Sequence, residues 1–175
     1  KAAILLAALL VLPVFGQERG NPVFSDDFNN YQTSLENWKP TGDAKQSEGK
    51  ISLGSWESKF AVPPEFYVEV DVVFTSDKNP DGNAFAGLSC DNRIFGVTPD
   101  GCVFPAGGLP KTKIEGFKTG EPVHLVIVRE CVAKAAAYVF KVNGKEIARQ
   151  GASLPTELKE ALAIQGSGAE DAAKT

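Results

Sequence analysis

The chain has no methionine, a single histidine, two tryptophans and three cysteines in its 175 residues. His124 has no second His or Cys near it in sequence, so no zinc-ligand spacing is present and we interpret it as a packed structural residue. No serine lies in a G-x-S-x-G elbow, and no glycine loop of the phosphate-binding kind occurs. These absences leave no familiar catalytic motif.

Neither sign of charge dominates the chain, which has 22 Asp and Glu residues and 18 Lys and Arg residues. The formal net charge is −4 and no basic stripe is visible, which argues against nucleic acid and anionic lipid as partners. The length suits one domain with a core. With Gly 17, Pro 11 and Phe 11, the composition favours many strands joined by turns over a helical bundle.

The longest apolar run, residues 2–12, is too short to span a bilayer. Lys1 precedes it and Gly16 follows it, a pattern typical of a secretory signal peptide cut before Gln17. We therefore expect residues 1–16 to be the leader, 17–168 one β-sandwich domain and 169–175 a frayed tail. The expected location is secreted or periplasmic, with no stable membrane insertion after cleavage and no lipid anchor, because no Cys follows the run.

Cys90, Cys102 and Cys131 would lie in an oxidising compartment, and their odd number leaves at least one thiol without an intrachain partner. In a plain meander the strand at 93–97 would hold Cys90 and Cys102 too far apart for a disulfide. A Cys90–Cys102 disulfide and three buried thiols both remain open interpretations.

Residues 65–90 give the clearest strand signal. Apolar residues alternate with Tyr67, Glu69 and Asp71 over 66–74, which predicts a strand with one buried face. A loop rich in Asp, Asn, Pro and Gly separates this run from the strand-like run at 84–90. The sequence therefore predicts a long hairpin.

Turn residues divide the rest of the chain into short strands. We expect strands at 23–28, 49–53, 56–62, 93–97, 102–105, 111–118, 123–129, 136–142, 145–148 and 163–165, the second and third of them joined at Gly54-Ser55, and one short helix at 155–162. The segment 29–45 is polar and turn-rich. The fold class expected is all-β: a two-sheet antiparallel jelly-roll sandwich with at most one short helix.

The order of FSDDF, YVEVDVVF, DGNAFAGLSC, RIFGVTPDG, VHLVIVRE and YVFKVNGKEI resembles the concanavalin A-like lectin/glucanase superfamily, in particular its laminin-G-like jelly-roll domains. The similarity covers residues 24–164. It implies a sandwich fold and a carbohydrate as ligand. The family's usual closing strand has no counterpart in residues 169–175.

Glu69 and Asp71 resemble the Glu-x-Asp-x-Glu strand of that superfamily's retaining β-glucanases. Retaining chemistry needs two carboxyl groups about 5–5.5 Å apart across the scissile bond. Val73 stands where the third acid would be, so we expect an outward polar row rather than a catalytic strand.

Asp77, Asn79 and Asp81, followed by Gly82, match the opening of a calcium loop. Leu88 stands where the bidentate glutamate would be, so the match is partial. The same residues also suit a polar turn, and calcium is the only cofactor that the sequence suggests.

A glycan site needs exposed rings and convergent polar groups. We predict that Tyr67, Glu69, Asp71, Arg93 and Trp56 form it. The function expected is a secreted, non-catalytic glycan-binding module. The alternatives are a glycoside-processing enzyme of the same fold, similar to 3-keto-disaccharide hydrolases, and a structural or adhesive envelope domain.

Overall fold

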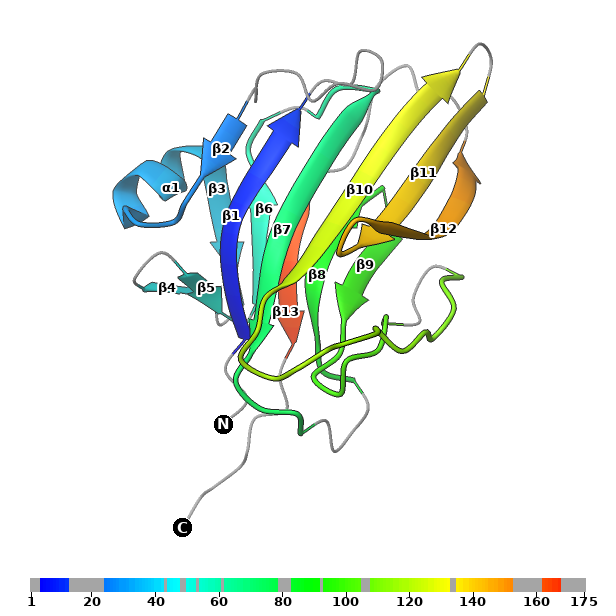
Figure 1. Cartoon of the computed structure of the whole chain (residues 1–175). Coiled ribbons are helices and arrows are strands. Elements are labelled where there is room, and N and C mark those ends of the chain that lie inside the picture. Colours follow the sequence, from blue (N-terminus) through cyan, green and yellow to red (C-terminus); the bar gives the residue numbers. More distant parts are fainter. Residues whose placement is uncertain are drawn as a thin grey trace.

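The structure is a computed structural model. It describes residues 4–12, 24–42, 44–47, 50–52, 54–60, 62–78, 83–91, 93–104, 108–132, 135–152 and 162–167. Over these residues the protein consists of two antiparallel sheets packed face to face, with one short helix beside them (Figure 1). This confirms the all-β, two-sheet sandwich predicted from the sequence.

The larger sheet, sheet A, has eight strands, seven of them in the order β12-β11-β10-β7-β1-β5-β4, with β2 paired to β1. Its members are β1 (Ile4–Leu12), β2 (Phe24–Asp26), β4 (Lys45–Ser47), β5 (Lys50–Ser52), β7 (Phe66–Phe74), β10 (Val123–Val132), β11 (Ala135–Val142) and β12 (Lys145–Ala152). The three strands β10 to β12 form a local meander, whereas β7 and β10 come from distant parts of the chain.

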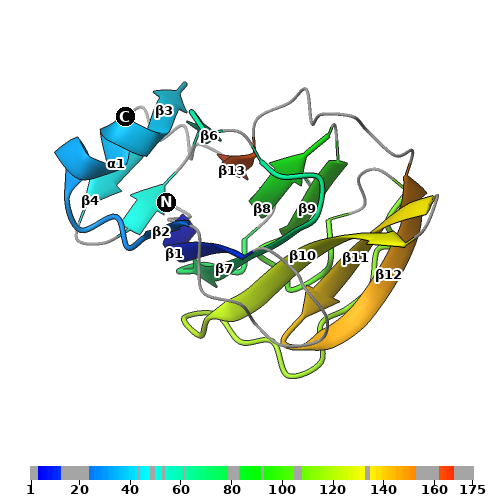
Figure 2. The same cartoon turned by 90° about the horizontal axis from the view of Figure 1, so that it is seen from above.

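Sheet B has five strands in the order β3-β6-β13-β8-β9. They are β3 (Trp38–Thr41), β6 (Gly54–Ser58), β8 (Phe85–Cys90), β9 (Arg93–Val97) and β13 (Ala163–Ser167). Seen from above, sheet B lies on one side of the curved sheet A and the core fills the space between them (Figure 2).

The strict alternation along β7 builds much of the core. Its apolar side chains, Phe66, Val68, Val70, Val72 and Phe74, are at most 1% exposed and face sheet B, while the residues between them are half-buried on the other face. From sheet B, β8 contributes Ala86, Leu88 and Cys90 to the same core. The buried face predicted for residues 66–74 is therefore confirmed.

The predicted hairpin between 66–74 and 84–90 is wrong. β7 pairs with β1 and β10 in sheet A, whereas β8 pairs with β9 and β13 in sheet B. The connecting loop therefore carries the chain from one sheet to the other. Alternation identifies the buried face of each strand but does not say whether two buried faces lie side by side or face each other.

The expected pairing of 49–53 with 56–62 fails in the same way. β5 lies in sheet A and pairs with β4 and β1, whereas β6 lies in sheet B and pairs with β3 and β13. The chain changes sheets at Gly54, whose φ of +77° suits a glycine. The segment 111–118 forms only a single bridge, Cys102 to Lys113, instead of an edge strand.

The helix predicted at 155–162 lies almost wholly outside the described residues. The structure instead has α1 (Tyr31–Asn37) in the segment expected to be polar and turn-rich. Asn30 is its N-cap and accepts hydrogen bonds from the backbone N–H groups of Gln32 and Thr33. Asparagine is among the preferred residues at this position, so the start of the helix had a local signal.

The carboxylate of Asp26 holds this helix to the sandwich. It accepts hydrogen bonds from the Phe28 N–H (2.8 Å), the Ser34 hydroxyl (3.0 Å) and the Trp38 indole N–H (3.1 Å). Asp26 is 9% exposed and the three donors come from a loop, α1 and β3. One carboxylate therefore joins both sheets to the helix.

The apolar run predicted to be the core of a leader forms β1, which lies between β7 and β5 in sheet A. The cleavage expected before Gln17 stays a prediction, and the described sandwich begins at Ile4. No helix among the described residues is long and apolar enough to cross a membrane.

No disulfide joins Cys90, Cys102 and Cys131. Cys90 is buried on the inner face of β8, and the other two are partly buried. Of the two open interpretations, the structure therefore favours buried thiols over a Cys90–Cys102 disulfide.

Candidate functional site

Polar side chains lie on the outer face of sheet A, along β7 and β10. Tyr67, Glu69 and Asp71 project from β7 because their apolar neighbours face the core. The register between β7 and β10 places His124 opposite Asp71, with Val126 opposite Glu69. Side chains directly opposite on one face lie close enough to interact.

These four residues, Tyr67, Glu69, Asp71 and His124, form the outer-face cluster. The Tyr67 hydroxyl donates to Glu69 Oε2 at 2.8 Å. The same carboxylate oxygen lies 3.3 Å from His124 Nε2, while His124 Nδ1 lies 2.8 Å from Asp71 Oδ1. The imidazole therefore bridges two carboxylates on the neighbouring strand.

The hydrogen-bonding pattern of the cluster depends on the protonation of His124. A neutral imidazole donates through one ring nitrogen, whereas an imidazolium donates through both. Since both nitrogens of His124 face carboxylate oxygens, only the charged ring donates to Glu69 and Asp71 at once. Asp71 and His124 are 44% and 34% exposed, so a ligand at this face can reach them.

His124 is the residue that sequence reasoning missed. The sequence favours a packed structural histidine, whereas in the structure the His124 side chain is 34% exposed and contacts two predicted ligand residues. Fifty-three positions separate it from Asp71, and only the pairing of β7 with β10 brings them together. No local motif could have signalled this contact.

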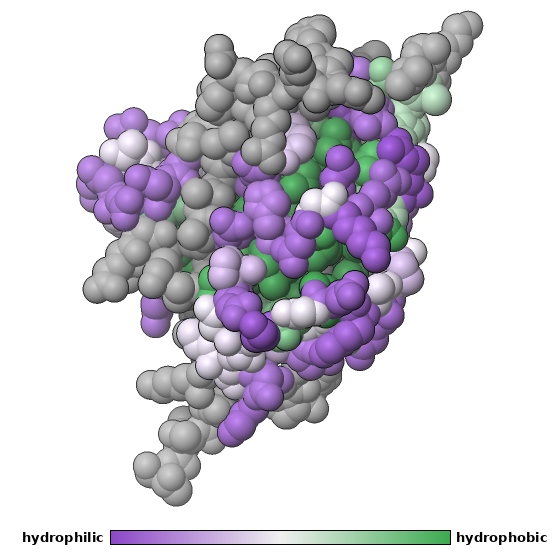
Figure 3. Space-filling view, in the orientation of Figure 1, coloured by the Kyte–Doolittle hydropathy of each residue, from purple (hydrophilic) through white to green (hydrophobic). Residues whose placement is uncertain are grey.

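An apolar strip lies beside the cluster. Val126, Val128 and Val139 point to the outer face of sheet A yet are at most 5% exposed, and Tyr67 packs against them. In Figure 3 hydrophobic atoms are visible between hydrophilic ones over the middle of this face. The polar cluster therefore lies beside a small, nearly buried apolar layer, against which the ring of Tyr67 packs.

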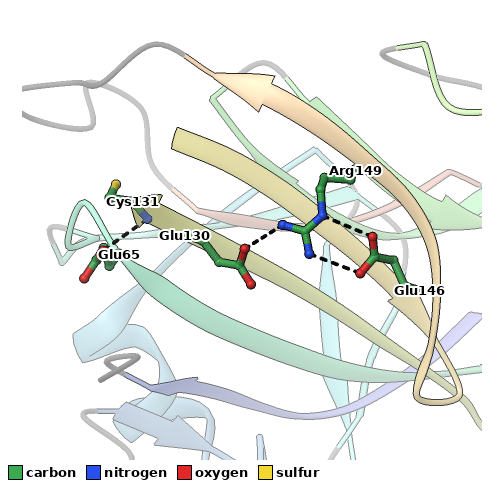
Figure 4. Close-up of polar contacts among 5 residues, drawn as sticks. All are labelled: Glu65, Glu130, Cys131, Glu146 and Arg149. Carbon is green, nitrogen blue, oxygen red and sulfur yellow. Dashed lines mark hydrogen bonds and ion pairs between the residues drawn. The ribbon is translucent and has the colours of Figure 1, made fainter. Parts of the chain in front are cut away.

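Arg149 borders the strip on the other side. From β12 it reaches across β11 to Glu130 on β10, with Nη1 2.6 Å from Glu130 Oε2 (Figure 4). Its Nε and Nη2 each lie 3.2 Å from the carboxylate of Glu146. The hydrogen bonds that Arg149 donates to Glu146 and then to Glu130 raise the pKa of its guanidinium, so the side chain keeps its charge. Further along β10, the Cys131 N–H donates to Glu65 Oε1 at 3.1 Å.

Two predicted ligand residues lie elsewhere. Trp56 is 1% exposed and packs in the core against Phe28. Arg93, on β9 of sheet B, pairs with Asp91 at 2.8 Å, and its guanidinium lies 4.5 Å from the centre of the Tyr138 ring. The structure therefore brings together Tyr67, Glu69 and Asp71 but not Trp56 or Arg93.

Arg93 belongs to a polar network inside one end of the sandwich. Tyr138 donates to Asp91 Oδ2 at 3.1 Å and also lies 5.5 Å from the guanidinium of Arg129. Arg129 is fully buried, and its Nη1 donates to the carbonyl of Pro64. These contacts hold β9, β10 and β11 together, which is a structural role.

The predicted calcium loop is only partly described. Asp77 is exposed, and Asn79 and Asp81 lie outside the described residues. Among the described residues no group of three or more His, Cys, Asp and Glu side chains could hold a metal ion. A calcium site at Asp77, Asn79 and Asp81 stays a prediction.

The geometry defines the class of the molecule as an antiparallel β-sandwich with a hydrogen-bonded polar cluster on one sheet face. No protein-family model matches the chain, and no curated protein and no solved structure was found to match it. The resemblance to the concanavalin A-like superfamily therefore stays a prediction.

Proposed function

We propose that the protein is a non-catalytic binding module and that a glycan binds to the outer face of sheet A at the outer-face cluster. One observation carries the proposal: hydrogen bonds from Tyr67 to Glu69 and between His124 and Asp71, with a 3.3 Å contact between Glu69 and His124, join these four residues in one row beside the apolar strip. A sugar presents hydroxyl groups, which the carboxylates and the imidazole can bind, and a C–H surface, which can contact the half-buried ring of Tyr67.

Each part of the face has a role toward a sugar. Carboxylates accept hydrogen bonds from adjacent hydroxyls, and Asp71 and Glu69 offer oxygens two residues apart on one strand. The Tyr67 ring is fixed by its hydrogen bond to Glu69 and by packing on the valines, so little side-chain entropy is lost on binding. The module would act outside the cytoplasm, as a secreted or periplasmic protein.

The test is retention on a polysaccharide array together with calorimetry on the retained glycan. Tyr67→Ala should abolish retention, and Glu69→Gln should weaken binding by about tenfold to a hundredfold, the range expected for a lost hydrogen bond to a charged group. The matched control is Tyr31→Ala, because Tyr31 is an exposed aromatic residue on α1. Unchanged retention by Tyr67→Ala with an unchanged melting temperature would overturn the placement.

The arrangement of His124 favours one other function. A histidine oriented by a carboxylate at 2.8 Å is a recurring arrangement for proton transfer, so a glycoside-processing enzyme is the second candidate. An assay for sugar release, run with wild type and His124→Asn, separates the two. Release that depends on His124 would replace the binding module by an enzyme, whereas neither binding nor release would leave a structural or adhesive role.

A further inference from the structure

A concave site that includes no member of the outer-face cluster lies beside the β11–β12 hairpin. It is a groove of about 500 Å³ between the β11–β12 hairpin and residues 112–115. Its apolar lining comes from Val103, Ile114, Val142 and Ile147. This volume is within the range of small-ligand sites.

Extended backbone borders the groove on both sides. The Ile114 N–H donates to the Gly101 carbonyl at 2.9 Å and the Val103 N–H to the Thr112 carbonyl at 2.8 Å. In this antiparallel pattern the N–H and C=O of Lys113 point away from the strand that contains Cys102. No backbone partner for these two groups occurs among the described residues. Opposite, β12 is the last strand of sheet A, so one of its edges is unpaired within the described sheet.

Each wall carries one positive and one negative side chain, Lys113 and Glu115 on one and Lys145 and Glu146 on the other. Of the charged residues that line the groove, Lys113 donates to the Asp100 carbonyl and Glu146 pairs with Arg149. The other two charged residues, Glu115 on one wall and Lys145 on the other, are exposed and have no ion-pair partner among the described residues. A ligand with an ammonium group at one end and a carboxylate at the other would complement them.

We propose that this groove binds a short extended peptide with free termini. The peptide ammonium pairs with Glu115 and the peptide carboxylate with Lys145, while apolar side chains contact the valine and isoleucine lining. Its backbone hydrogen-bonds to the open edges of β12 and residues 112–115, as in other additions of a peptide strand to a sheet edge. This site is independent of the glycan face, and neither proposal rests on the other.

Calorimetry with the tetrapeptide Val-Thr-Val-Thr tests the proposal on the full chain. The free-ended peptide should bind, and N-acetylation or C-amidation should each weaken binding by about tenfold, the loss expected when one ion pair is removed. Glu115→Gln should reproduce the effect of acetylation and add nothing to it, and Lys145→Gln should do the same for amidation. Glu36→Gln and Lys39→Gln are matched controls, because both residues are exposed outside the groove.

Two results would overturn the proposal. One is no heat of binding from the free-ended peptide at millimolar concentration. The other is binding that neither cap nor either substitution changes, which would place the peptide elsewhere. The capped peptides are tested on the wild-type protein. The comparison of capped with free-ended peptide therefore stays valid even if Glu115→Gln or Lys145→Gln fails to fold.

Discussion

At the scale of single residues, buried polar groups determine where the chain is most sensitive. Asp26, Arg129 and Tyr138 are each at most 9% exposed, and each has hydrogen bonds to groups on other elements. A buried polar group that loses its partner costs more than the hydrogen bond contributed. Two predictions follow from this asymmetry.

Asp26→Ala removes the buried acceptor that the Phe28 N–H, the Ser34 hydroxyl and the Trp38 indole N–H share. We expect the free energy of unfolding to fall by about 3 kcal/mol. Urea unfolding followed by tryptophan fluorescence measures it. Asp27→Asn is the control, because Asp27 is exposed and its side chain bonds to Asn29 alone among the described residues; equal effects of the two changes would contradict the role of Asp26.

The raised pKa of Tyr138 predicts that the free energy of unfolding decreases at alkaline pH. Burial, followed by the nearby Cys90 and Asp91, raises the pKa of Tyr138 far above its usual value. The folded state therefore keeps this proton at a pH where the unfolded chain loses it. Stability is full below the ordinary tyrosine pKa of about 10 and falls by up to about 1.4 kcal/mol per pH unit above it.

Melting temperatures between neutral pH and about pH 11 check this, with Tyr138→Phe as the comparison. The phenylalanine variant keeps the ring between the two arginines but has no proton to lose. Its melting temperature should therefore fall less steeply with pH than that of wild type. Parallel curves would show that Tyr138 does not titrate in this range.

At the scale of elements, the β11–β12 hairpin is the best-specified unit. Asn143 and Gly144 have φ angles of 48° and 80°, as a two-residue turn with left-handed backbone requires. The Asn143 side chain also accepts a hydrogen bond from the His124 N–H at 2.9 Å, which ties the turn to β10 and to the outer-face cluster. The turn therefore fixes both the hairpin and one end of the site.

Gly144→Ala should destabilise the protein by about 1 kcal/mol, because a Cβ is strained in left-handed backbone. Gly151→Ala on β12 is the matched control: a Cβ has open space at both positions, and only Gly144 has a positive φ. Chemical denaturation of both variants gives the comparison. Equal stability of the two would mean that the turn geometry contributes little.

Local signals predicted the elements that local physics determines. The alternation of Val and Phe with polar residues fixed β7, the Asn-Gly turn fixed β11–β12, and Asp91-Asn92 fixed the pairing of Cys90 with Arg93. The partners of β7 and β5 could not be predicted, because their alternation is equally satisfied in either sheet. The outer-face cluster shows the same limit. The polar residues of β7 could be predicted from their alternation, whereas His124 joins them only through the long-range pairing of β10 with β7.

At the scale of the whole molecule, β13 joins the two parts of sheet B. It lies between β6 and β8 and pairs with both. A chain that ends at residue 161 lacks this strand and should show no cooperative unfolding transition and no near-ultraviolet circular dichroism. A chain that ends at residue 167 keeps β13 and should behave like the full chain; cooperative unfolding of the shorter one would contradict the role of β13.

The position of β13 also sets the timing of folding during synthesis. About 70 residues separate β8 from β13, and β6 lies still further back in the chain. At ~5–20 residues per second, a ribosome needs roughly 4 to 15 s to make that stretch. During those seconds β6 and β8 have no strand to join them. Sheet B can therefore close only after nearly all of the described chain has been made, and until then its apolar faces are available to chaperones.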